Sequence, residues 1–238
     1  MTNSAIPFDK HEYWAQRFEH EASFEWLLPW SVLEPQMRAH NLLPEDSTAK
    51  ILNLGCGNSD LPLDLYRSGY RNVTSVDFVA SVIDRMRERC ERAIGWQSAT
   101  LSHETKDDIN PGECPLQFLE MDCLDMSRLP EQSFQLCFDK STSDAISCGD
   151  DDEYTKLRNL CVQVARVVTR PSGLWCVVSY SKFRQFEWTE GPGRGLWRTE
   201  QIVEIKTEQH QKKEKHAEAT HKVFVPDVHQ FIYVNRRL

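Results

Sequence analysis

The 238-residue sequence lacks an excess of positive charge, a long apolar run and any closely spaced pair of cysteines. Its 28 Lys and Arg residues are outnumbered by 36 Asp and Glu residues, which gives a formal net charge of −8 at pH 7. A chain of this charge does not attract phosphate backbones as a whole, so we expect no nucleic-acid partner. The longest apolar stretches, residues 26–33 and 174–178, fall well short of the ~20 residues that a membrane helix requires, so we expect no membrane span.

The eight cysteines are scattered along the chain and never form a Cys-x-x-Cys motif, which disfavours a zinc knuckle or a redox pair. His210, His216 and His221 lie in one charged stretch of low apolar content, which favours a solvated loop over a metal site. We therefore expect no metal. Residues 1–14 lack a basic segment followed by an apolar one, which argues against a secretory signal. The expected compartment is the cytoplasm.

The sequence does contain enough apolar residues, 40% of positions, for one well-cored domain. Apolar periodicity and glycine or proline breaks predict strands that alternate with helices, which implies a mostly parallel sheet. The expected strands are residues 50–54, 72–78, 116–121, 134–139 and 174–180, and the expected helices are residues 59–67, 79–93 and 152–169. Residues 94–113 are polar with little periodicity and are expected to form a surface loop.

The pattern differs at the two ends of the chain. Residues 197–207 and 231–235 have strand patterns but are joined by a charged stretch without an apolar helical face, so we expect them to pair antiparallel. Residues 8–40 are rich in Trp and Phe. They are expected to form one or two helices across the end of the sheet, where they could act as a lid.

A glycine turn follows the first expected strand. Gly55 and Gly57 precede a helix, so backbone N–H groups at its N-terminus face the crevice where open α/β sheets bind ligands. Asp77 ends the second strand 22 residues after Gly55 (77 − 55), where a carboxylate can accept bonds from the hydroxyls of a ribose. Two simpler explanations stay open: the glycines can serve a tight bend alone, and Asp77 can cap the following helix.

The third position after Gly57 distinguishes two kinds of nucleoside ligand. A dinucleotide fingerprint has a third glycine there, close to the pyrophosphate, whereas this chain has Asp60, whose negative charge disfavours a diphosphate. S-adenosylmethionine has no phosphate and carries an ammonium and a sulfonium, for which nearby acids are favourable. Asp122, at the end of the third strand, is placed to accept from an adenine amino group. These features predict S-adenosylmethionine as the cofactor.

At these residues the chain resembles the class I, seven-β-strand, S-adenosylmethionine-dependent methyltransferases. It is most similar to the branch of elongation factor 1-alpha lysine methyltransferases and their methyltransferase-like relatives. The segments that carry the resemblance are residues 13–18 (YWAQRF), 24–26 (FEW), 51–59 (ILNLGCGNS), 72–77 (NVTSVD), 121–122 (MD) and 139–145 (DKSTSDA).

The resemblance implies a Rossmann-like α/β fold: a mostly parallel seven-stranded sheet with a C-terminal antiparallel hairpin and helices on both faces. It implies one methyltransferase domain over residues 1–238. Within it, residues 1–40 would form an N-terminal helical lid, residues 50–180 the cofactor-binding core, and residues 181–238 a substrate-side segment with the hairpin.

The resemblance also implies which residues hold the cofactor. Residues of the N-terminal segment would close over it, Gly55 would line its methionine end, and strand-end residues would hold its ribose and adenine. The implied set is Trp14, Phe18, Trp26, Gly55, Gly57, Asp77, Phe78, Asp122, Cys123 and Lys140. Without the resemblance, packing in the core would explain Trp14 and Trp26 equally well. Phe18 stands where related sequences often have Tyr, which removes a hydroxyl.

Three functions stay open at this stage. The first is a protein lysine N-methyltransferase, with a translation elongation factor as one candidate substrate. The second is a small-molecule N-, O- or S-methyltransferase. It is favoured by Ser141 and Ser143, which replace a glycine and an apolar residue of the resembled branch, and by Phe183, Phe186 and Trp188, which could form an apolar pocket. The third is a non-catalytic member that binds cofactor or partner only.

Methyl transfer from a sulfonium needs alignment of the acceptor and exclusion of water more than acid–base chemistry. Asp139 and Asp144 are the nearest carboxylates that could orient an acceptor amine, although either could serve only as a helix cap or strand-end charge. We therefore assign no catalytic base from the sequence.

Overall fold

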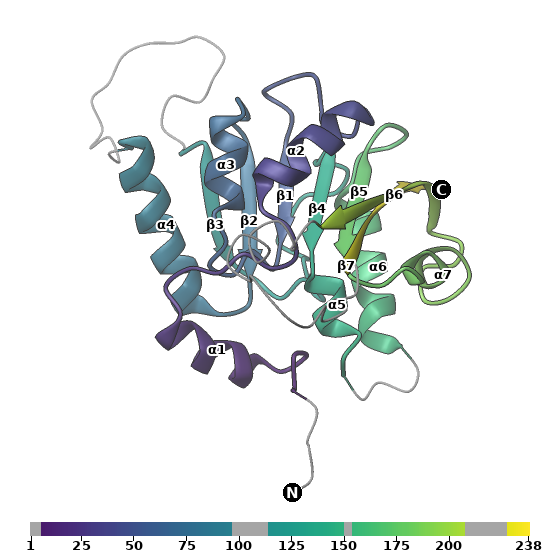
Figure 1. Cartoon of the computed structure of the whole chain (residues 1–238), viewed down its shortest axis with the longest axis horizontal. Helices are drawn as coiled ribbons and strands as arrows, with labels where there is room; N and C mark the ends of the chain where they lie inside the picture. Colours follow the sequence, from purple (N-terminus) through teal and green to yellow (C-terminus); the bar gives the residue numbers. More distant parts are fainter. Residues whose placement is uncertain (1–5, 97–113, 150–153, 208–227) are drawn as a thin grey trace, which may run out of the picture.

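The computed structural model describes residues 6–96, 114–149, 154–207 and 228–238. Within them, seven strands form one sheet in the order β3-β2-β1-β4-β5-β7-β6 (Figure 1). The strands are β1 Ile51–Leu54, β2 Val73–Asp77, β3 Leu116–Glu120, β4 Leu136–Lys140, β5 Leu174–Ser179, β6 Trp197–Thr207 and β7 Val228–Arg237. The first five pair in parallel, and β7 pairs antiparallel with both β5 and β6. The expected mostly parallel sheet with an antiparallel hairpin is confirmed.

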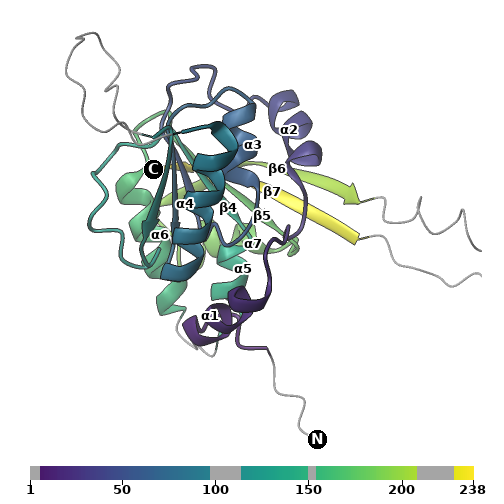
Figure 2. The same cartoon turned by 90° about the vertical axis from the view of Figure 1, so that its left-hand side faces the viewer.

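Helices cover both faces of the sheet, as Figure 2 shows with α2 and α3 on one side and α6 on the other. The helices are α1 His11–His20, α2 Trp30–Ala39, α3 Leu61–Arg67, α4 Ala80–Ile94, α5 Thr142–Ile146, α6 Thr155–Val167 and α7 Arg184–Thr189. In Figure 1, α1 lies below the sheet, on the side where β4 runs into α5. Because β4 is one of the parallel strands, this is the side of their carboxyl ends.

The central strands are buried on both faces, which is why they read as apolar runs rather than as alternating patterns. Alternate residues of β1 belong to separate cores: Ile51 packs with α2, α3 and α4, and Leu52 packs with α6 and α7. Leu33 of α2 and Trp188 of α7 are both fully buried, one in each core. The two cores fix the sheet between its helices, and so fix where its strand ends lie.

Several boundaries differ from the sequence-based expectation. The strand expected at residues 231–235 is longer, Val228–Arg237, because it pairs along both of its edges. The helix expected at residues 152–169 covers Thr155–Val167. Two short helices, α5 and α7, were not predicted, because five or six residues are too few to show a helical period.

Some expectations fall outside the described residues. They concern most of the loop expected at residues 94–113, and the three histidines of the charged stretch, His210, His216 and His221.

Candidate functional site

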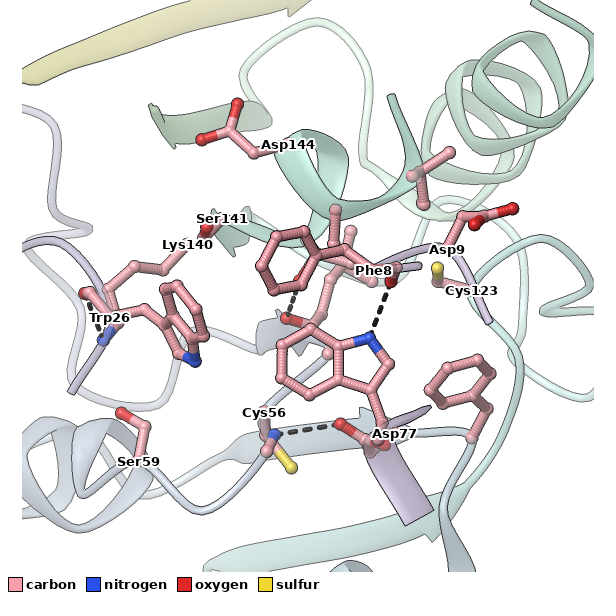
Figure 3. A pocket seen from close by; sticks show the side chains of 18 of the residues that line it. Phe8, Asp9, Trp26, Cys56, Ser59, Asp77, Cys123, Lys140, Ser141 and Asp144 are labelled. Carbon is pink, nitrogen blue, oxygen red and sulfur yellow. Dashed lines mark hydrogen bonds between the residues drawn. The ribbon is translucent and has the colours of Figure 1, made fainter. Parts of the chain in front are cut away.

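A cavity of about 570 Å³ lies between the carboxyl ends of β1, β2 and β4 and the N-terminal segment (Figure 3). Its wall includes all ten residues that the sequence pointed to: Trp14, Phe18, Trp26, Gly55, Gly57, Asp77, Phe78, Asp122, Cys123 and Lys140. The structure thus brings together residues that lie more than a hundred positions apart in the chain. Their contact with a cofactor remains a prediction, and the geometry of each group shows what it can do.

The glycine turn after β1 requires glycine at both positions. Gly55 and Gly57 have φ angles of 52° and 49°, in the left-handed region that favours glycine. A Cβ atom at Gly55 would lie 2.3 Å from the Oγ1 atom of Thr142, and one at Gly57 would lie 3.3 Å from the ring of Phe18. The turn is therefore packed closely against both α5 and the N-terminal segment.

Asp77 lies at the end of β2 with a side chain that is almost fully buried. Its Oδ2 accepts the N–H of Gly57 at 2.9 Å, and its Oδ1 accepts the N–H of Val79 at 3.0 Å. Burial raises the pKa of this carboxyl from 3.8 to about 6, although the two N–H bonds favour the charged form. Asp77 thus fixes the glycine turn and the start of α4, and each of its oxygens keeps room for a second donor.

The segment after β3 contributes Asp122 and Cys123 to the same wall. The Oδ1 atom of Asp122 accepts the N–H of Leu124 at 2.8 Å, and the rest of this carboxylate faces solvent. Burial raises the pKa of the Cys123 thiol, so this side chain is a neutral surface. Phe78 packs edge-to-face against His11, with ring centroids 5.1 Å apart. One exposed acid beside apolar surface suits a flat, weakly polar group.

Aromatic side chains of the N-terminal segment form the opposite wall. The indole N–H of Trp14 donates to the carbonyl of Phe8 at 2.7 Å. Its ring packs on those of Phe18 and Trp26, with centroids 5.6 and 5.9 Å away. The guanidinium of Arg17 lies 4.8 Å from the ring centroid of Trp26. Trp14, Phe18 and Trp26 thus form an apolar wall, called the aromatic roof below, at the place expected for a lid.

The ammonium of Lys140 is held by the N-terminal segment. It lies 2.6 Å from Oε2 of Glu25 and donates to the carbonyl of Trp26 at 3.1 Å. Burial lowers the pKa of this ammonium, and Glu25 opposes the shift. The sequence reasoning missed Glu25, although it stands in the Phe-Glu-Trp segment that carried part of the resemblance.

The two candidate acids beyond β4 differ in their surroundings. Asp144 lines the cavity, but its Oδ1 accepts from the Oγ of Ser179 at 2.6 Å and from Nε of Arg184 at 2.9 Å, and its Oδ2 accepts the N–H of Tyr180 at 3.2 Å. Its charge is therefore compensated by Arg184.

Asp139 is fully buried and does not line the cavity. Its Oδ1 accepts the N–H groups of Thr142 and Ser143, which open α5, at 3.0 and 3.2 Å. Its Oδ2 has no hydrogen-bond partner in the described part of the chain. The geometry of Asp139 fits the cap role that the sequence left open.

The pocket expected from Phe183, Phe186 and Trp188 is wrong. Phe183 and Phe186 are 70% and 59% exposed, whereas Trp188 is fully buried, with its ring centroid 4.6 Å from that of Trp175. None of the three lines the cavity. The reason is helical spacing: Phe183, just before α7, and Phe186 are three positions apart and both face outward, whereas Trp188 follows Arg184 by four positions and both are buried.

Within the ranges that the structure describes, no group of three or more His, Cys, Asp or Glu side chains is arranged to hold a metal ion. Within the same ranges, none of the helices is both long enough and apolar enough to cross a membrane.

The surroundings of Asp139 predict how stability depends on pH. Burial, with a contribution from the nearby charge of Asp144, raises the pKa of Asp139 from 3.8 to about 7. Between these values the folded chain binds more protons than the unfolded chain, so this group makes stability fall as pH rises from about 4 to 7. Asp139→Asn keeps an oxygen for the α5 cap and does not titrate. We expect the variant to gain on the order of a few kcal/mol relative to the wild type between pH 5 and pH 8.

Urea unfolding of both proteins at the two pH values checks this expectation. Equal differences in unfolding free energy at pH 5 and pH 8 would show that Asp139 is ionised throughout.

Similarity to individual known proteins places the chain in a family, although no family model matches the sequence. It is 39% identical to methyltransferase srdJ of Neurospora crassa, over 74% of this chain and 68% of that protein. It is 32% identical to EEF1A lysine methyltransferase 4 of Bos taurus, over 60% of this chain and 48% of that protein. It is 31% identical to the eEF1A lysine and N-terminal methyltransferase homolog of Drosophila pseudoobscura pseudoobscura, over 71% of this chain and 22% of that protein. The chain thus spans half or less of the two eEF1A relatives.

Solved structures agree on the fold. N-methyltransferase NodS of Bradyrhizobium japonicum WM9, in complex with S-adenosyl-L-homocysteine, has a TM-score of 0.56 at 15% identity, over 94% of this chain and 98% of that one. Geranyl diphosphate C-methyltransferase of Streptomyces coelicolor A3(2) has a TM-score of 0.56 at 12% identity, over 99% and 100%. The chain belongs to the class I S-adenosylmethionine-dependent methyltransferases. S-adenosylmethionine is the cofactor of this class.

Proposed function

We propose that the chain is a protein lysine N-methyltransferase whose cofactor occupies the cavity beneath the N-terminal segment. The observation that carries the proposal is the convergence of the glycine turn, Asp77 and Asp122 on one cavity under an aromatic roof. The lysine acceptor is supported by the relatives named as eEF1A lysine methyltransferases. These names favour a translation elongation factor as the substrate. With such a substrate, the proposed location is the cytoplasm. The absence of a nucleic-acid partner stays a prediction.

The cavity offers a distinct surface to each part of the cofactor. Asp77 would accept from the ribose hydroxyls with the lone pairs that its backbone N–H bonds leave free. Phe78, Cys123 and Asp122 would bind the adenine, with Asp122 accepting from its amino group. Gly55 and Gly57 would border the methionine part, which comes close to the backbone because neither glycine has a side chain.

The chain's part in the reaction is to position the acceptor and exclude water. When bound, the cofactor would supply a methyl group on a sulfonium: the acceptor nitrogen would form a bond to the methyl carbon while the carbon–sulfur bond breaks and its electron pair goes to sulfur. The roof of Trp14, Phe18 and Trp26 would keep water from the cavity. Because Asp144 is paired with Arg184, we assign the proton of the acceptor amine to water rather than to this acid.

An exposed aromatic face beside the cavity favours a protein acceptor. This aromatic face consists of Tyr180, Phe183 and Phe186, which are 55%, 70% and 59% exposed, and Tyr180 also lines the cavity. An acceptor small enough to lie wholly inside the cavity would leave these rings in water, whereas a protein surface can cover them.

A methyl-transfer assay with labelled S-adenosylmethionine tests the proposal. The purified chain is given either lysate proteins freed of small molecules, with purified eEF1A as a separate sample, or the small-molecule fraction of the same lysate. We expect label on a lysine of a protein, located by mass spectrometry. Label confined to the small-molecule fraction would replace the proposal by a small-molecule methyltransferase. No label in either sample, with cofactor bound, would leave a non-catalytic binding protein.

The aromatic face makes a prediction of its own. Phe183→Ala combined with Phe186→Ala should raise KM for the protein acceptor about tenfold or more, because two exposed rings are lost from the contact surface. The affinity for S-adenosylmethionine should not change, since neither ring lines the cavity. Steady-state kinetics and calorimetry measure the two quantities.

Ile202→Ala is the matched control, because Ile202 is 40% exposed on β6 and does not line the cavity. If the double variant and this control have the same KM, the aromatic face does not bind the acceptor.

A further inference from the structure

One carboxylate joins three parts of the chain next to the cavity, although it is not itself among the lining residues. Glu25 lies in the segment between α1 and α2. Its Oε2 is 2.6 Å from the ammonium of Lys140 at the end of β4, and its Oε1 accepts the N–H of Asp60, just before α3, at 2.7 Å. The two partners are 115 and 35 positions away in sequence. Glu25 therefore connects the N-terminal segment to the end of β4 and to the start of α3.

The ammonium of Lys140 depends on this contact. The Lys140 side chain is only 5% exposed, and a buried cation without a partner is strongly unfavourable. Glu25 and the carbonyl of Trp26 accept two of its three N–H bonds. The third has no acceptor among the described residues, and Lys140 lines the cavity. A cation with one free donor thus stands at the cavity wall, held by two consecutive residues of the N-terminal segment.

Other contacts of the same segment act elsewhere. The side-chain amide of Asn58 and the guanidinium of Arg85 both donate to the carbonyl of Glu21, at 2.9 and 3.2 Å. These bonds fix the end of α1, four residues before Glu25. Glu25 is next to Trp26, whose ring lines the cavity.

We propose that Glu25 is a positioning residue for the cofactor: it holds the ammonium of Lys140, which also donates to the carbonyl of Trp26, so that the N-terminal segment and a cation are fixed together at the cavity wall. The inference rests on the proposed function, in which S-adenosylmethionine occupies this cavity. The carboxylate of the methionine part is the one anionic group of that cofactor. This carboxylate would accept a hydrogen bond from the free N–H of Lys140.

Glu25→Gln tests the role of Glu25, because a neutral amide keeps the size of the side chain and loses the ion pair with Lys140. The dissociation constants of S-adenosylmethionine and of decarboxylated S-adenosylmethionine are measured by calorimetry. We expect the first to rise about tenfold or more and the second to rise much less, because the decarboxylated compound has no group for the cation. Glu34→Gln is the matched control: Glu34 pairs with Arg38 on the surface of α2, 2.7 Å apart, and neither residue lines the cavity.

Two further measurements separate positioning from general damage. Lys140→Met should lose the same preference for the carboxylated compound. Adding Glu25→Gln to Lys140→Met should weaken binding little further, because both changes remove the same ion pair between Glu25 and Lys140. In Glu25→Gln the alkaline limit of S-adenosylmethionine binding should move to lower pH, because the ammonium loses its partner. The other charges that face this pair come from α3 and its cap: Asp64, with Arg67, and Asp60, with Arg89.

The outcomes distinguish this inference from the proposed function. If the wild-type chain binds S-adenosylmethionine and Glu25→Gln binds both compounds as the wild type does, or loses both equally, Glu25 does not position the cation. If the wild-type chain binds neither compound, the cofactor site itself is wrong and this inference falls with it. Should Glu25→Gln fail to fold, Glu25→Asp replaces it, because the shorter carboxylate keeps its charge but cannot reach both partners.

Discussion

Asp77→Asn should weaken the binding of S-adenosylmethionine more than tenfold. The carboxylate would make charge-assisted bonds to the ribose, each worth about 1.5 to 3 kcal/mol. The amide also turns an N–H group toward one of the two backbone N–H groups, of Gly57 or Val79, that Asp77 now accepts. Calorimetry measures the affinity, and Asp84→Asn is the control, because Asp84 is an exposed residue of α4 paired with Arg87.

The same residue predicts a pH dependence of binding. Burial raises the pKa of Asp77 to about 6, so the carboxylate becomes protonated as pH falls through that value. A protonated carboxyl accepts fewer bonds, and we expect the affinity of the wild-type chain to fall from pH 8 to pH 5. The Asn variant should lose this part of the pH dependence. Equal affinity of the variant and the wild type at pH 8 would exclude Asp77 from the cofactor site.

Gly55→Ala should destabilise the fold and abolish cofactor binding. An alanine at φ 52° is strained by about 1 to 2 kcal/mol. In addition, its Cβ atom would lie 2.3 Å from Oγ1 and 2.9 Å from Cγ2 of Thr142, so α5 or the turn must move. Because Thr142 also donates to the carbonyl of Leu54, the displacement would reach the end of β1.

Gly95→Ala provides the matched control. Gly95 has a φ of 68° at the end of α4, and beyond its chain neighbours and the backbone of α4 no atom of the described residues lies within 4 Å of an added Cβ, so this variant carries the backbone strain without the clash. The difference between the two losses in unfolding free energy, measured in urea, isolates the contact with Thr142. Adding Thr142→Ala to Gly55→Ala should recover part of the loss. If the two glycine variants lose equal stability, the close contact between the turn and α5 is wrong.

The sheet could be predicted because each strand is recognisable from a short stretch of neighbouring residues. Each strand of the parallel part is a short apolar run that ends at a turn, and Gly55 and Asp77 stand at strand ends. In a parallel sheet those ends share one edge, so residues that follow different strands meet without any need to know the strand order. This is why the seven candidate residues that end or follow strands line one cavity, whereas Trp14, Phe18 and Trp26 lie before the first strand and were implied by the resemblance alone.

What the sequence did not reveal depends on tertiary contacts. Glu25 is an acid among aromatic residues, and only the folded chain shows that Lys140 and Asp60 meet it. The start of α5 depends on Asp139, whose carboxylate accepts two N–H groups of a five-residue helix. Phe183 and Phe186 were placed in a pocket because they are aromatic, whereas their spacing on α7 turns them outward.

The place of β7 between β5 and β6 constrains how the chain can fold while it is being synthesised. Among the strands that the structure describes, β6 pairs only with β7, and β7 is synthesised after it. A nascent chain that has emerged through β6 therefore has five strands in place and a sixth with no neighbour, and both β5 and β6 expose unpaired backbone groups until the last strand arrives. β7 completes the sheet by inserting between β5 and β6, so the interval after β6 has been synthesised and before β7 has been is when the growing chain is most open to pairing with another chain.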